Sequence, residues 1–138
     1  MRSASTPETY LGTKRAMGWL PMEPRNGVQD FARPAGAEVP LSRFAYAGRW
    51  KITGEDATAL APGAAIDTTI QASDAYLVLS SKDGTARTVK VVEPGHAPRL
   101  ITVQRQRLYT LDHWASPGRH RLTIYPSPGV TGYAFTFG

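Results

Sequence analysis

Residues 44–52, FAYAGRWKI, alternate large apolar side chains with small or charged ones. The large apolar residues of this stretch are Phe44, Tyr46, Trp50 and Ile52. Because successive side chains of a strand point to opposite faces of a sheet, this period of two predicts a half-buried β-strand. We therefore expect Trp50 to lie in the core, and Arg49 and Lys51 to lie on the opposite face.

The same alternation recurs along the chain after Pro40. In residues 66–71, Ile66, Thr68 and Ile70 oppose Asp67, Thr69 and Gln71. Further alternating or apolar segments are AYLVLSSK (75–82), ARTVKVVE (86–93), LITVQ (100–104), RLYTL (107–111), RHRLTIY (119–125) and VTGYAFTF (130–137). KDG at residues 82–84 is typical of a hairpin turn, so we expect the segments before and after it to pair with each other.

These segments predict an all-β fold, because no stretch of ten residues after Pro40 has a helical pattern. About seven to nine short strands, joined by turns rich in Gly, Pro, Asp and Ser, favour an antiparallel sandwich over a parallel sheet. The pattern alone fits either a jelly roll or an immunoglobulin-like sandwich.

Residues 1–39 form a leader of different composition. TPETYLG at residues 6–12 predicts a short helical turn, with Thr6 as N-cap and Gly12 as terminator. Pro21 and Pro24 exclude a longer helix. The leader residues that we expect to pack on the sandwich are Tyr10, Leu11, Trp19 and Leu20.

Length and charge set further bounds. A chain of 138 residues suits one domain, in which the leader packs on a sandwich formed by residues 40–138. Residues 1–6 are too short and polar for a signal peptide or a membrane span. Sixteen Lys and Arg residues against eleven Asp and Glu residues give a net charge of +5. Such a balance suits either attraction of anionic ligands or an ordinary solvated strand face.

Three stretches resemble one known family: TPETYLG (6–12), AGRWKITGE (47–55) and RLYTLDHWASPGRHRLTIYPSPGVTGYAFTFG (107–138). They are similar to the C-terminal domain of DipZ-type thiol-disulfide oxidoreductases of the cytochrome c biogenesis family. The resemblance implies a jelly-roll domain like those of carbohydrate-binding modules, preceded by a membrane part and a thioredoxin-like domain. It also implies an extracytoplasmic location, in the periplasm or cell envelope. VVEPG (91–95) departs from the family, which has an Asp-Gly turn there.

We expect no enzymatic activity from this chain. The redox chemistry of the family needs a Cys-x-x-Cys pair, and the chain has no cysteine. His96, His113 and His120 lack a nucleophile elbow beside them. Glu55 and Asp56 are adjacent, so in a strand their carboxyl groups would point apart rather than flank a glycosidic bond.

The sequence suggests two ligand-binding surfaces. Trp114 lies in DHWASPG (112–118), which we expect to be a loop between two strands and which offers a ring for sugar stacking. The other surface is the polar face of the sheet, which includes Asp67 and Thr69. The candidate ligand-binding residues are Trp114, Asp112, Arg49, Lys51, Gln71, Arg121 and Tyr125. Packing within the domain and an ordinary wet surface are the alternatives.

The expected function is non-catalytic binding of a carbohydrate or cell-wall polymer. The alternative is a structural domain that docks on a thioredoxin-like neighbour or on client proteins, through the leader around Tyr10 and Trp19. Nucleic-acid binding is not expected, because the basic residues lack interleaved aromatic residues. We expect no cofactor, although a structural calcium ion stays open: Asp74 and Asp83 are too sparse for a calcium loop, but many jelly-roll glycan binders hold one.

Overall fold

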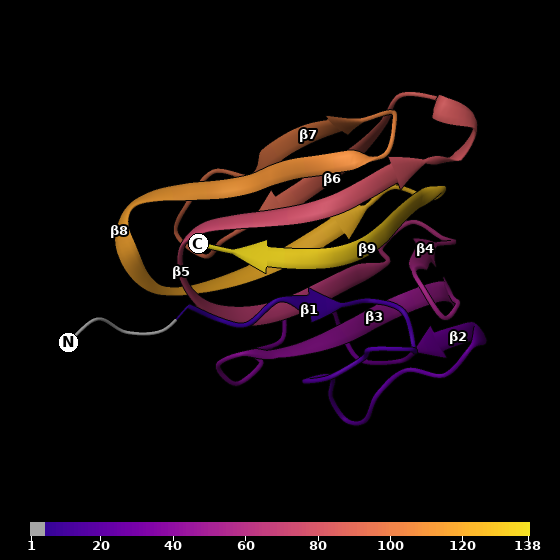
Figure 1. Ribbon diagram of the computed structural model, residues 1–138, viewed down its shortest axis with the longest axis horizontal. Helices are drawn as coiled ribbons and strands as arrows, with labels where there is room; N and C mark the ends of the chain where they lie inside the picture. Colours follow the sequence, from indigo (N-terminus) through magenta and orange to yellow (C-terminus); the bar gives the residue numbers. More distant parts are fainter. Residues whose placement is uncertain (1–4) are drawn as a thin grey trace.

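The computed structural model describes residues 5–138 and is all-β (Figure 1). Its strands are β1 (Thr9–Tyr10), β2 (Gly27–Phe31), β3 (Arg43–Ile52), β4 (Ala57–Ala59), β5 (Ala65–Ser81), β6 (Arg87–Val92), β7 (Arg99–Val103), β8 (Arg107–Pro126) and β9 (Val130–Phe137). A three-residue 3₁₀ turn, η1 (Lys82–Gly84), follows β5. The predicted all-β sandwich is confirmed. Within residues 5–138, no helix is long and apolar enough to cross a membrane.

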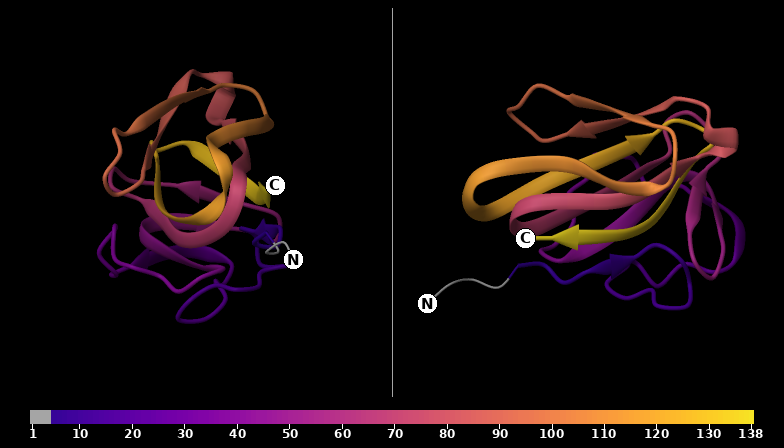
Figure 2. Two further views of the ribbon diagram at one scale, coloured as in Figure 1. Left: turned by 90° about the vertical axis from the view of Figure 1, so that its left-hand side faces the viewer. Right: turned by 45° about the horizontal axis from the view of Figure 1, so that its top comes forward.

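The two longest strands, β5 and β8, run through both layers of the sandwich (Figure 2). In the first layer, the first half of β5 pairs with β3 and with the second half of β8, which in turn pairs with β6. In the second layer, the second half of β5 pairs with β9 and with the first half of β8. On the other side, β4 pairs with both β3 and β9. All these ladders are antiparallel, and together they close the sandwich around one core.

The core lies between the two layers. Trp50 is 1% exposed, as predicted, and its indole N–H donates to the Ala47 carbonyl oxygen at 2.9 Å. Phe44 of β3 meets Phe135 of β9 with ring centroids 5.1 Å apart. The alternation in residues 44–52 therefore has the predicted cause, because every second side chain of β3 faces the opposite layer.

The leader adds strands rather than the predicted helical turn. The prediction for residues 6–12 is wrong, because Thr9 and Tyr10 are extended and pair with Phe135 and Ala134 at the edge of β9. Pairing with an exposed strand edge satisfies backbone groups that an isolated helical turn would leave open to water. β2, also in the leader, pairs with β3. Leu11 and Trp19 are buried, at 0% and 2% exposure.

The sequence predicts Asp67 on the solvent-facing side of the sheet, but the structure buries this residue. It points away from the core but is only 2% exposed, because a leader segment covers this part of the first layer. Its carboxylate forms an ion pair with Arg33, and the Gly36 N–H donates to its two oxygens at 3.1 and 3.0 Å. The Thr123 hydroxyl also donates to it. Asp67 therefore holds the leader onto β5 and β8.

The turn at residues 82–84 forms, but the hairpin predicted around it is wrong. β6 pairs with β7 and β8 instead of β5. Both edges of the second half of β5 are already occupied by β8 and β9. The chain therefore changes layers at the turn. Asp83 and Gly84 allow this sharp reversal with positive φ angles of 58° and 66°.

The segment 112–118 is not a loop between two strands, because β8 continues from Arg107 to Pro126. Its pairing with β5 has its widest interruption between the pairs His113–Asp74 and Gly118–Ala72, and a one-residue irregularity follows between Ala75 and Tyr76. At this bend, β8 has four residues between the flanking pairs where β5 has one. The longer path fits β8 lying on the outside of the bend as both strands pass from one layer to the other.

Candidate functional site

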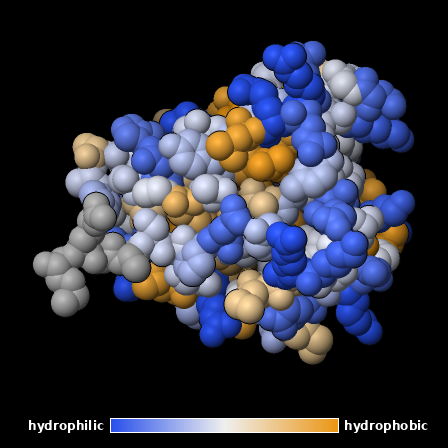
Figure 3. Space-filling model, viewed as in Figure 1, coloured by the Kyte–Doolittle hydropathy of each residue, from blue (hydrophilic) through white to orange (hydrophobic). Residues whose placement is uncertain are grey.

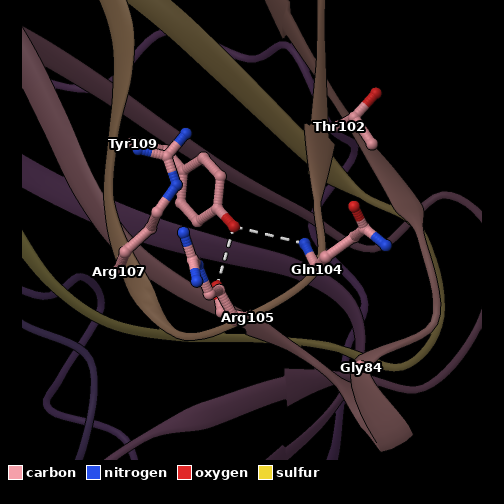
Figure 4. Close-up of a pocket in the computed structure, with 6 residues that line it drawn as sticks. All are labelled: Gly84, Thr102, Gln104, Arg105, Arg107 and Tyr109. Carbon is pink, nitrogen blue, oxygen red and sulfur yellow. Dashed lines mark hydrogen bonds between the residues drawn. The ribbon is translucent and has the colours of Figure 1, made fainter.

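A polar cleft opens at the end of the sandwich where the turn η1 meets the connection between β7 and β8 (Figure 4). We call it the β7–β8 cleft. Its volume is about 520 Å³, and its lining residues are Gly84, Thr102, Gln104, Arg105, Arg107 and Tyr109.

Tyr109 fixes the floor of the β7–β8 cleft. Its hydroxyl donates to the Arg105 carbonyl oxygen at 2.7 Å and accepts from the Gln104 backbone N–H at 3.2 Å (Figure 4). The Arg107 guanidinium lies over the Tyr109 ring, 4.3 Å from its centroid. The ring is only 4% exposed. These contacts hold the short connection between β7 and β8 in one conformation.

The side chains that line this cleft are free to bind a ligand. Among residues 5–138, the side chains of Thr102, Gln104 and Arg105 have no hydrogen-bond or ion-pair partner, and Arg107 contacts only the Tyr109 ring through its charge. Their donors and acceptors are therefore satisfied by solvent, and a ligand with hydroxyl or anionic groups can take the place of that solvent.

A second cleft lies beside the first, along the paired strands β4 and β9, and we call it the β4–β9 cleft. It has a volume of about 460 Å³ and is lined by Lys51, Thr58, Ala59, Leu60, Ser80, Ser81, Lys82, Gly129 and Thr131. The Ser81 N–H donates to the Gln104 carbonyl oxygen at 3.1 Å, which joins the two clefts. Arg87 braces the turn between them, because its guanidinium donates to the Ser81 hydroxyl at 2.8 Å and to the Lys82 carbonyl oxygen at 2.6 Å. We call the two clefts and this turn the loop end.

Trp114 lies in the bend of β8 and is half-buried against the core. Its indole stacks on the His120 imidazole, with ring centroids 3.7 Å apart and planes inclined by 9°. Glu93 accepts from the Trp114 indole N–H at 3.1 Å and lies 2.7 Å from His120 Nδ1. One face of the Trp114 ring is therefore covered. Glu93 lies in the segment VVEPG, so the departure from the resembled family forms part of this cluster.

Asp112 and Arg49 each lie in an ion pair near the surface. Asp112 accepts from Arg99 at 3.0 Å. Arg49 lies 3.5 Å from Asp30, and both side chains are more than half exposed. An ion pair that is exposed on both sides, such as Arg49–Asp30, contributes little to stability, so Arg49 can exchange its partner for another anion.

Gln71, Arg121 and Tyr125 lie on the first layer, partly beneath the leader. The backbone N–H of Gln71 donates to the Thr6 hydroxyl at 2.8 Å. Arg121 donates to a leader carbonyl oxygen at 2.6 Å. The Lys90 ammonium lies 4.9 Å from the centroid of the Tyr125 ring. All three are half-buried.

The seven candidate residues do not form one surface. Arg121 pairs with Thr69, which in turn pairs with Arg43. Lys51 lies eight residues further along β3, or about 27 Å at the rise of a β-strand. Of the seven, Lys51 lines a cleft at the loop end. The sequence indicates Arg105 and Arg107 only as part of a basic cluster that could attract anionic ligands, and not as members of a site. Gln104 was missed, although the polar run QRQR (104–107) was a visible signal.

Asp74 and His113 form the most exposed acid–base contact that involves histidine. The hydrogen bond from His113 lowers the pKa of the Asp74 carboxyl, and the charge of His113 adds to the effect. The Ser73 hydroxyl donates to Asp74 at 3.3 Å, so serine and histidine bind the same carboxylate rather than each other. A hydrolytic triad needs the serine to contact the histidine. Within the described residues, no group of three or more His, Asp or Glu side chains is placed to hold a metal ion.

Comparison with known protein families places this domain. A family described as the thioredoxin-like C-terminal domain matches residues 6–138. The chain belongs to this family. A search of curated proteins found no match.

Solved structures with the same fold include domains of carbohydrate esterases. A family two carbohydrate esterase from Cellvibrio japonicus matches 80% of the chain with a TM-score of 0.62 and 22% identity. A family two carbohydrate esterase from Clostridium thermocellum, in complex with cellohexaose, matches 69% with a TM-score of 0.56 and 17% identity. The chain spans about a third of the length of each esterase, 32% and 31%. At these identities, the likeness is one of fold.

Proposed function

We propose that this thioredoxin-like C-terminal domain is a non-catalytic module that binds carbohydrate or a cell-wall polymer. The observation that carries the proposal is the β7–β8 cleft, where polar side chains without protein partners surround a fixed floor. The carbohydrate esterases that share the fold add support, since one of them was solved with cellohexaose.

The chemistry of the cleft suits a sugar. Sugar hydroxyls both donate and accept, and the Gln104 amide and Thr102 hydroxyl do the same. A volume of about 520 Å³ lies within the range of small-molecule sites. The hydrogen bonds of the Tyr109 hydroxyl fix the backbone at Gln104 and Arg105, which lowers the entropy cost of ordering the site when a ligand binds.

The proposal extends to a parent protein of the DipZ type in the cell envelope. This chain has no cysteine, so thiol chemistry would belong to a thioredoxin-like domain elsewhere in that protein. A module that binds the cell wall would hold such an oxidoreductase close to its clients and raise their effective concentration. This role places the domain outside the cytoplasm.

Affinity electrophoresis in gels that contain cell-wall polysaccharides tests the proposal. We expect the wild-type domain to be retarded relative to a gel without polysaccharide. Gln104→Ala should weaken the retardation, whereas Gln106→Ala should not, because Gln106 is exposed nearby but does not line the cleft. A folded wild-type domain that migrates unchanged through every polysaccharide would contradict the proposal.

A second candidate function is docking on a thioredoxin-like neighbour. Most of the face in Figure 3 is hydrophilic, with small apolar patches. Met17 and Met22 of the leader are 77% and 67% exposed, and methionine adapts well to protein partners. Trp19 is buried and cannot contribute directly. Calorimetry with the isolated thioredoxin-like domain tests this role. The double variant Met17→Ser with Met22→Ser should abolish binding. If the wild-type domain itself shows no binding heat, docking on this neighbour is excluded.

A further inference from the structure

The loop end carries positive charges without partners. The lining residues of its two clefts include Lys51, Lys82, Arg105 and Arg107, but no Asp or Glu. None of these four side chains takes part in an ion pair within residues 5–138. The turn between the clefts holds one carboxylate, Asp83, which also makes no ion pair there. The loop end thus has an excess of positive charge that an anionic ligand can neutralise.

The loop end has no exposed aromatic ring on which a ligand could stack. Tyr109 is the aromatic residue of the two linings, and it is 4% exposed with Arg107 over its ring. Neutral sugars gain affinity by stacking on such rings, and so do the bases of single-stranded nucleic acids. Recognition at the loop end must therefore depend on hydrogen bonds. Guanidinium groups make their strongest hydrogen bonds to carboxylates and similar planar anions, through two parallel N–H···O bonds.

The two clefts flank a rigid turn. Arg87 and the contact between Ser81 and Gln104 fix residues 81–84, so the clefts keep a constant relative position. Hydroxyl groups accompany the cations in the β4–β9 cleft. The hydroxyl oxygens of Thr58 and Thr131 lie 2.6 Å apart there and share a hydrogen bond. This arrangement of hydroxyl groups and repeated positive charge on both sides of a narrow turn matches an extended polymer that repeats both hydroxyls and negative charge.

We propose that the loop end binds an acidic polysaccharide, whose carboxylates pair with Arg105 and Arg107 and whose chain crosses the turn to reach Lys51 and Lys82. The inference rests on the proposed function and adds to it the class of glycan. The carboxylates belong to sugar units of the uronic acid type. A phosphate-bearing lipid surface or a nucleic acid is a separate possibility that the test distinguishes.

Isothermal titration calorimetry with an oligogalacturonate and with a neutral oligosaccharide of equal length tests this proposal. Arg105→Gln with Arg107→Gln should weaken binding of the oligogalacturonate by about 10- to 100-fold, because two charge-assisted contacts are lost. Arg25→Gln with Arg119→Gln is the matched control. These arginines are exposed, lie outside both clefts and change the net charge equally. Thermal unfolding confirms that each variant folds.

The outcomes separate this inference from the proposed function. Binding of the neutral oligosaccharide alone would overturn the inference and leave the module a glycan binder. An equal loss in the control variant would also overturn it, because net charge rather than the cleft would then govern binding. Binding to neither oligosaccharide would overturn the inference, whereas the proposed function falls only if the domain also migrates unchanged through every polysaccharide gel. Tighter binding to RNA or to anionic lipid vesicles than to the oligogalacturonate would overturn the choice of an acidic glycan. Lys51→Gln should weaken the binding of a long oligogalacturonate. It should leave the binding of a digalacturonate unchanged, because a disaccharide fits within one cleft.

Discussion

Asp67→Ala should destabilise the domain by about 3 kcal/mol. Asp67 is 2% exposed, and its removal leaves Arg33, whose side chain is 23% exposed, without a counter-ion. The Gly36 N–H and the Thr123 hydroxyl lose an acceptor as well. Breaking a buried pair from one side costs about 3–5 kcal/mol, and the partial exposure of Arg33 places this case at the lower limit.

Urea denaturation followed by tryptophan fluorescence measures the effect. With a slope of about 2 kcal/mol per M, the midpoint should fall by about 1.5 M. Asp30→Ala is the control, because it breaks the exposed pair with Arg49 and should cost less than about 1 kcal/mol. If Asp67→Ala costs no more than Asp30→Ala, the carboxylate does not hold the leader and the reasoning is refuted.

Three further predictions concern other parts of the molecule. Glu93→Ala should red-shift tryptophan emission, because the smaller side chain lets water reach the Trp114 indole N–H in place of the carboxylate, and unchanged emission would contradict this contact. Gly12→Ala should lower stability by about 1–3 kcal/mol in calorimetry, since a Cβ would collide with the backbone of the loop after β3; equal stability would show that the leader can shift. The pKa of Asp74 is lowered by His113, so its contribution to stability is present above its unfolded pKa of about 3.9 and is lost as pH falls through the lower folded value. Asp74→Asn should therefore flatten the acid limb of stability below about pH 4, and an NMR titration midpoint of Asp74 at its ordinary value would contradict this.

The alternation of side chains predicted the strands and the core well, because burial between two layers imposes a period of two. Phe44, Trp50 and Ile52 are all buried as FAYAGRWKI indicates. The turn at residues 82–84 also forms. The partners of the strands could not be predicted, since both edges of β5 are occupied by strands that lie far along the chain.

Other differences arise from long-range covering. Asp67 points away from the core as its position in the alternation predicts, yet the leader covers it, and no local pattern reveals that contact. Trp114 resembles a loop residue because Ser116, Pro117 and Gly118 follow it, whereas these residues let β8 bend around β5. The clefts could not be predicted because each is built from segments far apart in sequence, such as Gly84 with Tyr109.

Titration of the nitrogen-15-labelled domain with an oligogalacturonate, followed by NMR, tests most directly whether the loop end holds the ligand. We expect progressive shifts in the backbone amide signals of Lys82, Gln104 and Arg105 and in the side-chain signal of Arg107, with the Trp114 indole signal unchanged. Shifts centred on Trp114, or no shifts in a folded sample at saturating oligogalacturonate, would contradict the account.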